Sequence, residues 1–171
     1  PGGMLRWGIP AFRLPRELVR EEVAEVERLG VSIRTGTRIS GTAALRREFD
    51  AVLLATGLPA SRRLAIPGHG LEGVWHGLEY LKAVASGGRP CLGESVLVIG
   101  GGQVALDCAL TAATLGAGTV TLASLESARE MSSLAWEMHL ARVAGIQFQH
   151  GWGPVMIRAE GRHLAASFQS C

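Results

Sequence analysis

The sequence predicts an α/β fold built around a parallel β-sheet, and three observations in its second half carry this prediction. Residues 96–99 form a short apolar run that is typical of a buried strand in a parallel sheet. A glycine-rich turn and a helix-like stretch to about Leu115 follow it. A second apolar run at 119–123 comes after the glycine turn 116–118. Strand, turn, helix and strand in this order make a βαβ unit with parallel strands.

The turn after the first strand has the spacing G-x-G-x-x-A at Gly100, Gly102 and Ala105. The first glycine permits a tight turn, the second lets the backbone approach a pyrophosphate, and the small third residue lets helix and strand pack closely. The helix N-terminus carries a partial positive charge that favours phosphate. We therefore predict a dinucleotide site, the alternative being a plain βα turn of another α/β fold. The residues assigned to this site are Gly100, Gly101, Gly102, Gln103, Val104 and Ala105.

Composition limits the class of protein. The 171 residues are 47% hydrophobic and 19% charged with a net charge of +2, which is typical of a globular α/β protein with a sizeable core. Lys82 is the only lysine, and no basic stripe alternates with aromatic residues, so we expect no nucleic-acid partner. No apolar run approaches the ~20 residues of a membrane span. We expect a cytoplasmic protein with no membrane contact.

The first half contains fewer signals. A helix is predicted from Pro15 to about Leu29, where Gly30 ends it. Residues 31–34 and 49–55 are predicted strands, and proline and glycine are frequent in the connector 58–95, which one short helix at 78–84 interrupts. This half has no glycine-rich loop. It is therefore expected to be the trailing part of a nucleotide-binding domain, cut from a longer polypeptide.

After the βαβ unit, Ser132 or Ser133 is expected to cap a helix that runs to about Ala144. A strand at 146–150 and a hairpin around Glu160-Gly161 follow. The residues expected to face inward from the helix are Leu134, Met138 and Ala141. We divide the chain into residues 1–88, the trailing part of one domain with the connector, and 89–171, a nucleotide-binding domain.

Several kinds of catalytic site are missing from the sequence. Cys108 lacks a C-x-x-C partner, so disulfide reduction is not expected, and we expect it to pack as a small buried side chain. The five histidines show no metal-ligand spacing, and no serine lies in a G-x-S-x-G elbow, so neither a metal site nor a hydrolase is predicted. Asp107 is expected to face a domain interface. No catalytic acid or base is assigned, which is consistent with hydride transfer between cofactors.

Three segments of the chain resemble one family. The segment 1–15, Pro-Gly-Gly-Met-Leu-Arg-Trp-Gly-Ile-Pro-Ala-Phe-Arg-Leu-Pro, is similar to the flavin-side loop of the glutamate synthase small (β) subunit and its relatives. These relatives include the flavin module of dihydropyrimidine dehydrogenase and belong to the pyridine nucleotide-disulfide oxidoreductase superfamily. Ala55-Thr56-Gly57 resembles the segment that ends a strand of the FAD domain. The stretch 100–107 and Arg129-Glu130-Met131 resemble the NAD(P)H domain, which this family inserts into its FAD domain.

The resemblance implies a Rossmann-like flavoprotein with two dinucleotide-binding domains and two cofactors. A hydride passes from NAD(P)H to FAD, and electrons leave through iron–sulfur clusters on another domain or a partner subunit. By position, Arg13 would contact FAD, the Ile39 backbone would meet its adenine, and Thr56 and Gly57 would lie near it. No cluster-binding cysteine pattern occurs here, so the clusters would lie outside this stretch, which alone is not expected to turn over.

Two departures from the family concern the choice of nucleotide. Many relatives carry two arginines after the second strand, whereas this chain has Leu125-Glu126, and Leu110 replaces a frequent arginine. The Glu126 carboxylate would accept a hydrogen bond from the adenosine ribose and repel a 2′-phosphate, so NADH is favoured over NADPH. Arg129 nearby opposes this preference. Two alternatives stay open: a self-contained NAD-dependent dehydrogenase of a small substrate, and a non-enzymatic NADH-sensing or interaction module.

Overall fold

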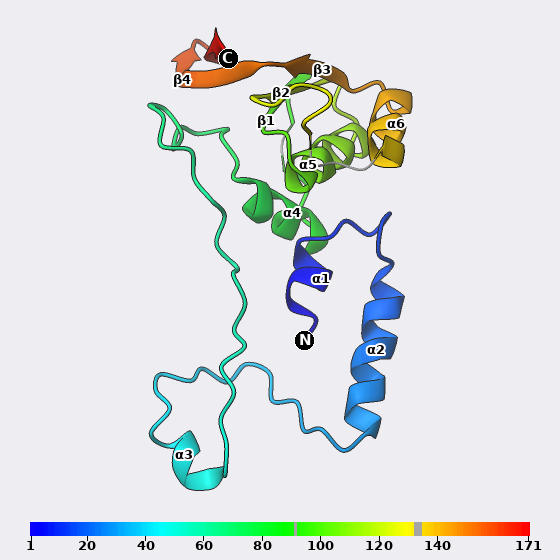
Figure 1. Cartoon of the computed structure of the whole chain (residues 1–171), viewed down its shortest axis with the longest axis vertical. Coiled ribbons are helices and arrows are strands. Elements are labelled where there is room, and N and C mark those ends of the chain that lie inside the picture. Colours follow the sequence, from blue (N-terminus) through cyan, green and yellow to red (C-terminus); the bar gives the residue numbers. More distant parts are fainter. Residues whose placement is uncertain (91, 132–134) are drawn as a thin grey trace.

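The computed structural model describes residues 1–90, 92–131 and 135–171, and its two halves differ in compactness. The second half is a packed α/β unit, and the first half is an open arrangement of helices and extended chain (Figure 1). Among the described residues, no helix is long and apolar enough to span a membrane.

The centre of the packed unit is a three-stranded parallel sheet. Strands β1 (Ser95–Ile99), β2 (Thr119–Ser124) and β3 (Gln147–His150) lie in this order across the sheet. Helix α5 (Gln103–Thr114) connects β1 to β2, and α6 (Ala135–Val143) lies between β2 and β3 in the chain. The predicted α/β class and βαβ unit are thus confirmed.

A hydrophobic core lies between the sheet, α5 and α6. Leu106 of α5 and Leu122 of β2 are almost completely buried, and Met138 and Ala141 of α6 join them as predicted. The predicted caps Ser132 and Ser133, and Leu134, lie outside the described residues. The other face of β1 is open, since Leu97 is 43% exposed. The prediction that the first strand is buried was therefore wrong, because β1 is an edge strand and the described helices pack on only one of its faces.

The hairpin predicted around Glu160-Gly161 is present. Strand β4 (Trp152–Glu160) pairs antiparallel with β5 (His163–Ser170), with an irregularity between Pro154 and Met156. The backbone N–H of Ile157 donates to the carbonyl of Pro67 at 2.9 Å, so the connector from the first half is attached to β4.

Four helices belong to residues 1–90, and two of them were predicted. Helix α2 (Arg16–Arg28) ends just before Gly30, whose φ of +92° suits glycine. Helix α4 (Gly77–Ala85) packs Tyr80 and Leu81 against Cys108 of α5. The short helices α1 (Gly3–Trp7) and α3 (Leu45–Glu48) were not anticipated from the sequence.

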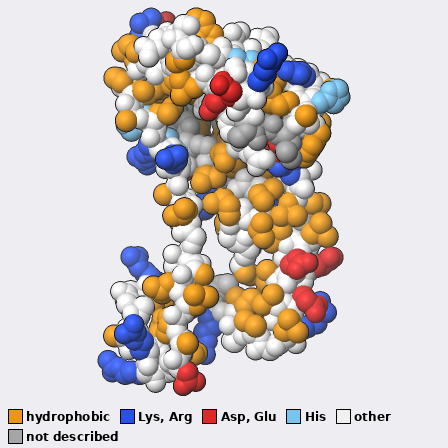
Figure 2. Space-filling view, in the orientation of Figure 1, with side chains coloured by type: hydrophobic (Ala, Val, Ile, Leu, Met, Phe, Trp, Pro, Cys, Tyr) orange, Lys and Arg blue, Asp and Glu red, His pale blue; other side chains and the backbone are white. Residues whose placement is uncertain are grey.

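The two strands predicted in the first half, 31–34 and 49–55, are absent: both segments are described, and neither belongs to a sheet. Leu53 is 90% exposed and Leu54 69% exposed. A strand needs a neighbour for its backbone hydrogen bonds, and these two runs pair with no strand in the part of the chain that the structure describes. Hydrophobic side chains consequently lie on the visible surface of the first half (Figure 2).

Candidate dinucleotide site

The glycine turn between β1 and α5 is held at the carboxyl end of the sheet. The N–H of Gly100 donates to the carbonyl of Ala123 on β2 at 2.8 Å. Gly100 has a φ of +135°, and a Cβ built on it would lie 3.4 Å from the Cβ of Ala105. A side chain at position 100 would be strained in this conformation, and a large one at position 105 would push the helix away from the strand.

The N-terminus of α5 is open to a ligand. Among the described residues, no side chain caps it, and its first turn holds no acidic residue. A Cβ built on the N-cap residue Gly102 would meet no described atom within 4 Å. Free N–H groups, the positive end of the helix dipole and this unfilled space are what a pyrophosphate requires, so the residues present fit a dinucleotide.

Glu126, the acid chosen from the sequence, lies beside this turn. It follows β2, and a Cβ on Gly101 would collide with its carboxylate and would lie 3.1 Å from the Cβ of Ser124. Gly101 therefore leaves the space that Glu126 occupies. The Glu126 residue is exposed, so its carboxylate is available to hydroxyl groups of a ligand next to the turn.

Sequence reasoning missed a polar pair beneath Glu126. The hydroxyl of Ser124, at the end of β2, lies 2.9 Å from the carbonyl oxygen of Glu126 and 3.2 Å from Nδ1 of His150, at the end of β3. The two residues are partners in the parallel register. The predicted ends of the two strands already placed both residues near the carboxyl edge of one sheet. Only the register of the two strands, which places Ser124 opposite His150, could not be predicted from the sequence.

Arg13 joins the N-terminal segment to α5 and α6. Its guanidinium lies 2.9 Å from the Asp107 carboxylate and 2.5 Å from that of Glu137, with its carbon 6.0 Å from the Trp136 ring centre. Both acids are buried, whereas the Arg13 side chain is 23% exposed. Arg13 is thus an ion-paired residue rather than a freely solvated arginine, and Asp107 faces the N-terminal segment.

Burial shifts the protonation equilibria in this cluster. Desolvation raises the pKa of Asp107 above its ordinary value, although the hydrogen bond from Arg13 acts in the opposite direction. The Asp107 hydrogen bond in turn raises the pKa of Arg13. Arg13 therefore stays charged, and it partly offsets the cost of two buried carboxylates.

Cys108 is an inert thiol in this structure. It is 7% exposed, and burial, with a smaller effect of the Asp107 charge, raises its pKa to about 12. The thiolate is the reactive form, so a protonated Cys108 is not expected to act as a nucleophile. This agrees with its predicted role as a small packed side chain.

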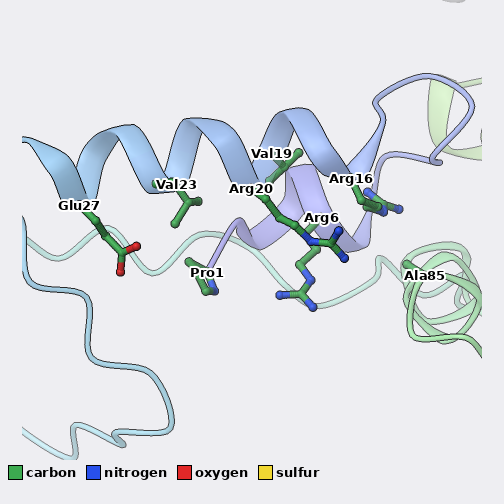
Figure 3. A pocket seen from close by; sticks show the side chains of 9 residues that line it. Pro1, Arg6, Arg16, Val19, Arg20, Val23, Glu27 and Ala85 are labelled. Atoms are coloured by element: carbon green, nitrogen blue, oxygen red, sulfur yellow. The ribbon is translucent and has the colours of Figure 1, made fainter.

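The four positions expected to meet FAD are not brought together. Ile39, Thr56 and Gly57 are exposed on the extended chain between α2 and α4, whereas Arg13 is held at α5 and α6 (Figure 1). A hollow of about 200 Å³ lies beside α1 and α2, where Arg6, Arg16 and Val19 line it (Figure 3). None of the predicted site residues lines this hollow. The described residues therefore do not by themselves enclose a flavin site.

A parallel sheet whose glycine turn leads into an open helix N-terminus, with an acid after the next strand, defines a dinucleotide-binding α/β unit. Residues 16–169 match the family model described as pyridine nucleotide-disulphide oxidoreductase. The chain belongs to this family, whose members are flavin-dependent NAD(P)H oxidoreductases. The resemblance seen in the sequence is thereby confirmed.

Curated relatives match almost the whole chain but are much longer. The chain is 38% identical over 165 residues to the NADP(+)-dependent formate dehydrogenase subunit beta of Moorella thermoacetica, covering 93% of this chain and 23% of that protein. It is 35% identical over 161 residues to the NAD-dependent dihydropyrimidine dehydrogenase subunit PreT of Escherichia coli K12, covering 92% and 39%. A putative glutamate synthase [NADPH] small chain of Cereibacter sphaeroides is 35% identical over 159 residues, covering 86% and 38%. The chain thus spans between about a quarter and two fifths of the length of these relatives.

A solved reductase structure illustrates that the fold is shared over most of the chain. The 2-naphthoyl-CoA reductase complex with 2-naphthoyl-CoA aligns with a TM-score of 0.69 at 18% identity, covering 91% of this chain and 24% of that one. At this identity the likeness concerns the fold alone.

Proposed function

We propose that this chain is the nucleotide-binding part of an electron-input module, in which NADH binds at the N-terminus of α5 and FAD is the hydride acceptor. The observation that carries this proposal is the open space at Gly102 in front of uncapped helix N–H groups. Family membership supports both cofactors. When bound, the reduced nicotinamide supplies the hydride; this chain's own residues bind and orient the dinucleotide.

The proposed preference for NADH rests on Glu126. Its carboxylate lies beside Gly101, where it can accept a hydrogen bond from a free ribose 2′-hydroxyl and repel a 2′-phosphate. The relatives do not decide this point, because their names include both NADP(+)-dependent and NAD-dependent proteins. The electrostatics of this chain therefore support the assignment.

Arg13, Ile39, Thr56 and Gly57 stay proposed contacts for FAD, as does the division of the chain at residues 88 and 89. Since the described residues do not enclose a flavin site, we propose that these positions complete one together with further protein. The relatives named as subunits support onward electron transfer to a partner subunit or an iron–sulfur domain. A cytoplasmic location stays a prediction.

Calorimetric titration with NADH and with NADPH tests the nucleotide assignment. We expect tighter binding of NADH, and we expect Glu126→Ala to lower the ratio of the two affinities about tenfold, since it removes one charge-assisted hydrogen bond and one repulsion. Glu94→Ala is the matched control, because Glu94 precedes β1 at the opposite end of the sheet. An unchanged ratio in Glu126→Ala would overturn the role of Glu126. Tight NADH binding without any flavin requirement would instead favour the sensing module.

A glycine substitution separates a ligand site from a plain turn. Gly102→Val adds a side chain in open space at a φ of −87°, so the fold should tolerate it while the pyrophosphate approach is blocked. We expect at least about a tenfold loss of affinity for both nucleotides with an unchanged circular dichroism spectrum. Gly41→Val, also in open space but away from the site, should bind as the parent does. Equal affinity in both variants would contradict the proposed site.

A further inference from the structure

The carboxyl ends of β2 and β3 are joined by a hydrogen-bond chain that none of the functional assignments above uses. Ser124 and His150 are opposite each other in the parallel register, and Ser124 is only 1% exposed. The Ser124 hydroxyl contacts two groups, the carbonyl oxygen of Glu126 at 2.9 Å and Nδ1 of His150 at 3.2 Å. This chain of hydrogen bonds therefore runs from His150 on β3, through Ser124 on β2, to the backbone carbonyl of Glu126, the residue assigned to the choice between NADH and NADPH.

The chemistry of a hydroxyl fixes the direction of this chain. A serine hydroxyl has a single hydrogen, and the Glu126 carbonyl can only accept. The hydroxyl must then donate to that carbonyl, so its oxygen accepts from His150. His150 consequently carries a hydrogen on Nδ1, and in the neutral ring Nε2 is left as the acceptor.

The orientation of the imidazole is also restrained. The Phe148 ring, two residues earlier on β3, stacks on His150 with ring centres 5.7 Å apart and planes 15° from parallel. Stacking limits rotation of the imidazole, and so keeps Nδ1 directed at Ser124.

We propose that His150 is a positioning residue for Glu126, and through Ser124 for discrimination between NADH and NADPH. The hydrogen bonds hold the Glu126 carbonyl at the end of β2, and Gly101 leaves room for the Glu126 carboxylate beside the turn. Without these hydrogen bonds, the segment after β2 is no longer fixed, and the Glu126 carboxylate is no longer held where the ribose would bind. This inference rests on the proposed role of Glu126.

The inference makes a spectroscopic prediction that needs no nucleotide. In the 171-residue chain labelled with ¹⁵N-histidine, long-range ¹⁵N–¹H correlation spectra of the neutral imidazole should show His150 with its hydrogen on Nδ1. Ser124→Ala removes the acceptor and should shift His150 toward the Nε2–H form. His139, exposed on α6, is the internal reference and should not change. An Nε2–H His150 in the parent protein would overturn the proposal by itself.

Substitutions at position 150 distinguish positioning from general packing. We expect His150→Ala to lower the ratio of NADH to NADPH affinity about three- to tenfold, which is the effect of losing one buried hydrogen bond. In His150→Asn the side-chain amide N–H lies near the place of Nδ1 and should restore the ratio, whereas in His150→Gln it lies near Nε2 and should not. His139→Ala is the matched control.

The outcomes separate this inference from the proposed function. If Glu126→Ala changes the ratio but His150→Ala does not, the positioning role is wrong and the proposed function stands. If Asn and Gln at position 150 behave alike, His150 acts by packing and the proposal is overturned. If Glu126→Ala itself has no effect, the role of Glu126 fails, and the selectivity role of His150 fails with it even where the Nδ1–H form is observed.

Discussion

Two apolar runs of similar composition adopt different structures in this molecule, since one is a strand in the sheet and the other joins no sheet. Val-Leu-Val-Ile at 96–99 lies in β1 and pairs with β2 over its whole length. Ala-Val-Leu-Leu-Ala at 51–55 is extended, joins no sheet, and leaves both Leu53 and Leu54 exposed. The first run has a crossover helix and a second strand directly after it in the sequence; the second run is followed by a long connector. An apolar run becomes a strand only where the chain also supplies a neighbour.

Hydrogen exchange should show the largest difference between the sheet that contains the first run and the second run at 51–55. Backbone amides of β2 that pair in the sheet centre, such as that of Leu122, are expected to exchange about a thousandfold or more slowly than amides of 51–55, because paired core strands open only by large-scale unfolding. Exchange followed by mass spectrometry at peptide resolution measures this. Strand-like protection over 51–55 would mean that this segment pairs in solution.

A matched pair of leucine substitutions compares the same two regions by stability. Leu122→Ala, at a fully buried position of β2, should reduce the free energy of unfolding by about 2–5 kcal/mol through lost burial and a cavity. Leu53→Ala, at a position that is 90% exposed, should change it by about 0.5 kcal/mol or less. Urea denaturation followed by circular dichroism reports both. Equal losses would show that Leu53 is buried in solution.

Arg13 joins the N-terminal segment to α5 and α6, so its removal tests how firmly the first half of the chain is attached to the second. Arg13→Ala leaves Asp107 and Glu137 without this counter-charge, and we expect a loss of about 2 kcal/mol, below the full cost of breaking a buried pair because Arg13 is partly exposed. Arg20→Ala, in an exposed pair with Glu17, should cost no more than about 0.5 kcal/mol. Urea midpoints measure the two effects. If Arg13→Ala left the free energy of unfolding unchanged, the ion-pair cluster would not hold the N-terminal segment.

The smallest expected effect is a change in the pH dependence of stability. Burial raises the pKa of Asp107 above its ordinary 3.8, so the unfolded chain releases this proton first as pH rises. The contribution of Asp107 to the free energy of unfolding is therefore fully present below about pH 3.8 and is lost as pH rises through the raised pKa. The asparagine in Asp107→Asn does not titrate, so between pH 3.8 and the raised pKa the stability of this variant should fall less with rising pH than that of the parent protein. Denaturant midpoints over this pH range measure how steeply stability changes with pH. A steeper fall in Asp107→Asn than in the parent protein would contradict the raised pKa of Asp107.

The elements that sequence reasoning predicted correctly are those whose determinants are close together in the chain. The β1–α5–β2 unit, the Gly30 end of α2 and the hairpin at Glu160-Gly161 each depend on a few neighbouring residues. Glu126 was found for the same reason, since it directly follows β2. Its place beside Gly101 agrees with the predicted site, while binding itself stays a prediction.

Contacts between distant segments could not be predicted in this way. Arg13 meets Asp107 and Glu137 across most of the chain, and no local pattern indicates that partnership. Ser124 and His150 meet only because β2 and β3 pair in one particular register. The failed strands at 31–34 and 49–55 have the same cause, because their own composition says nothing about whether a partner is present.

The packing of Glu126 on Gly101 links two positions in evolution. In this structure a Cβ at position 101 would collide with the Glu126 carboxylate and would lie 3.1 Å from the Cβ of Ser124, so a side chain at 101 requires the exposed carboxylate to move away from the turn. A lineage that replaced the acid to accept a 2′-phosphate would remove the closer of these two contacts, whereas the one with Ser124 would stay. Among descendants of this sequence, we therefore expect a small residue other than glycine at position 101 more often where position 126 no longer holds an acid.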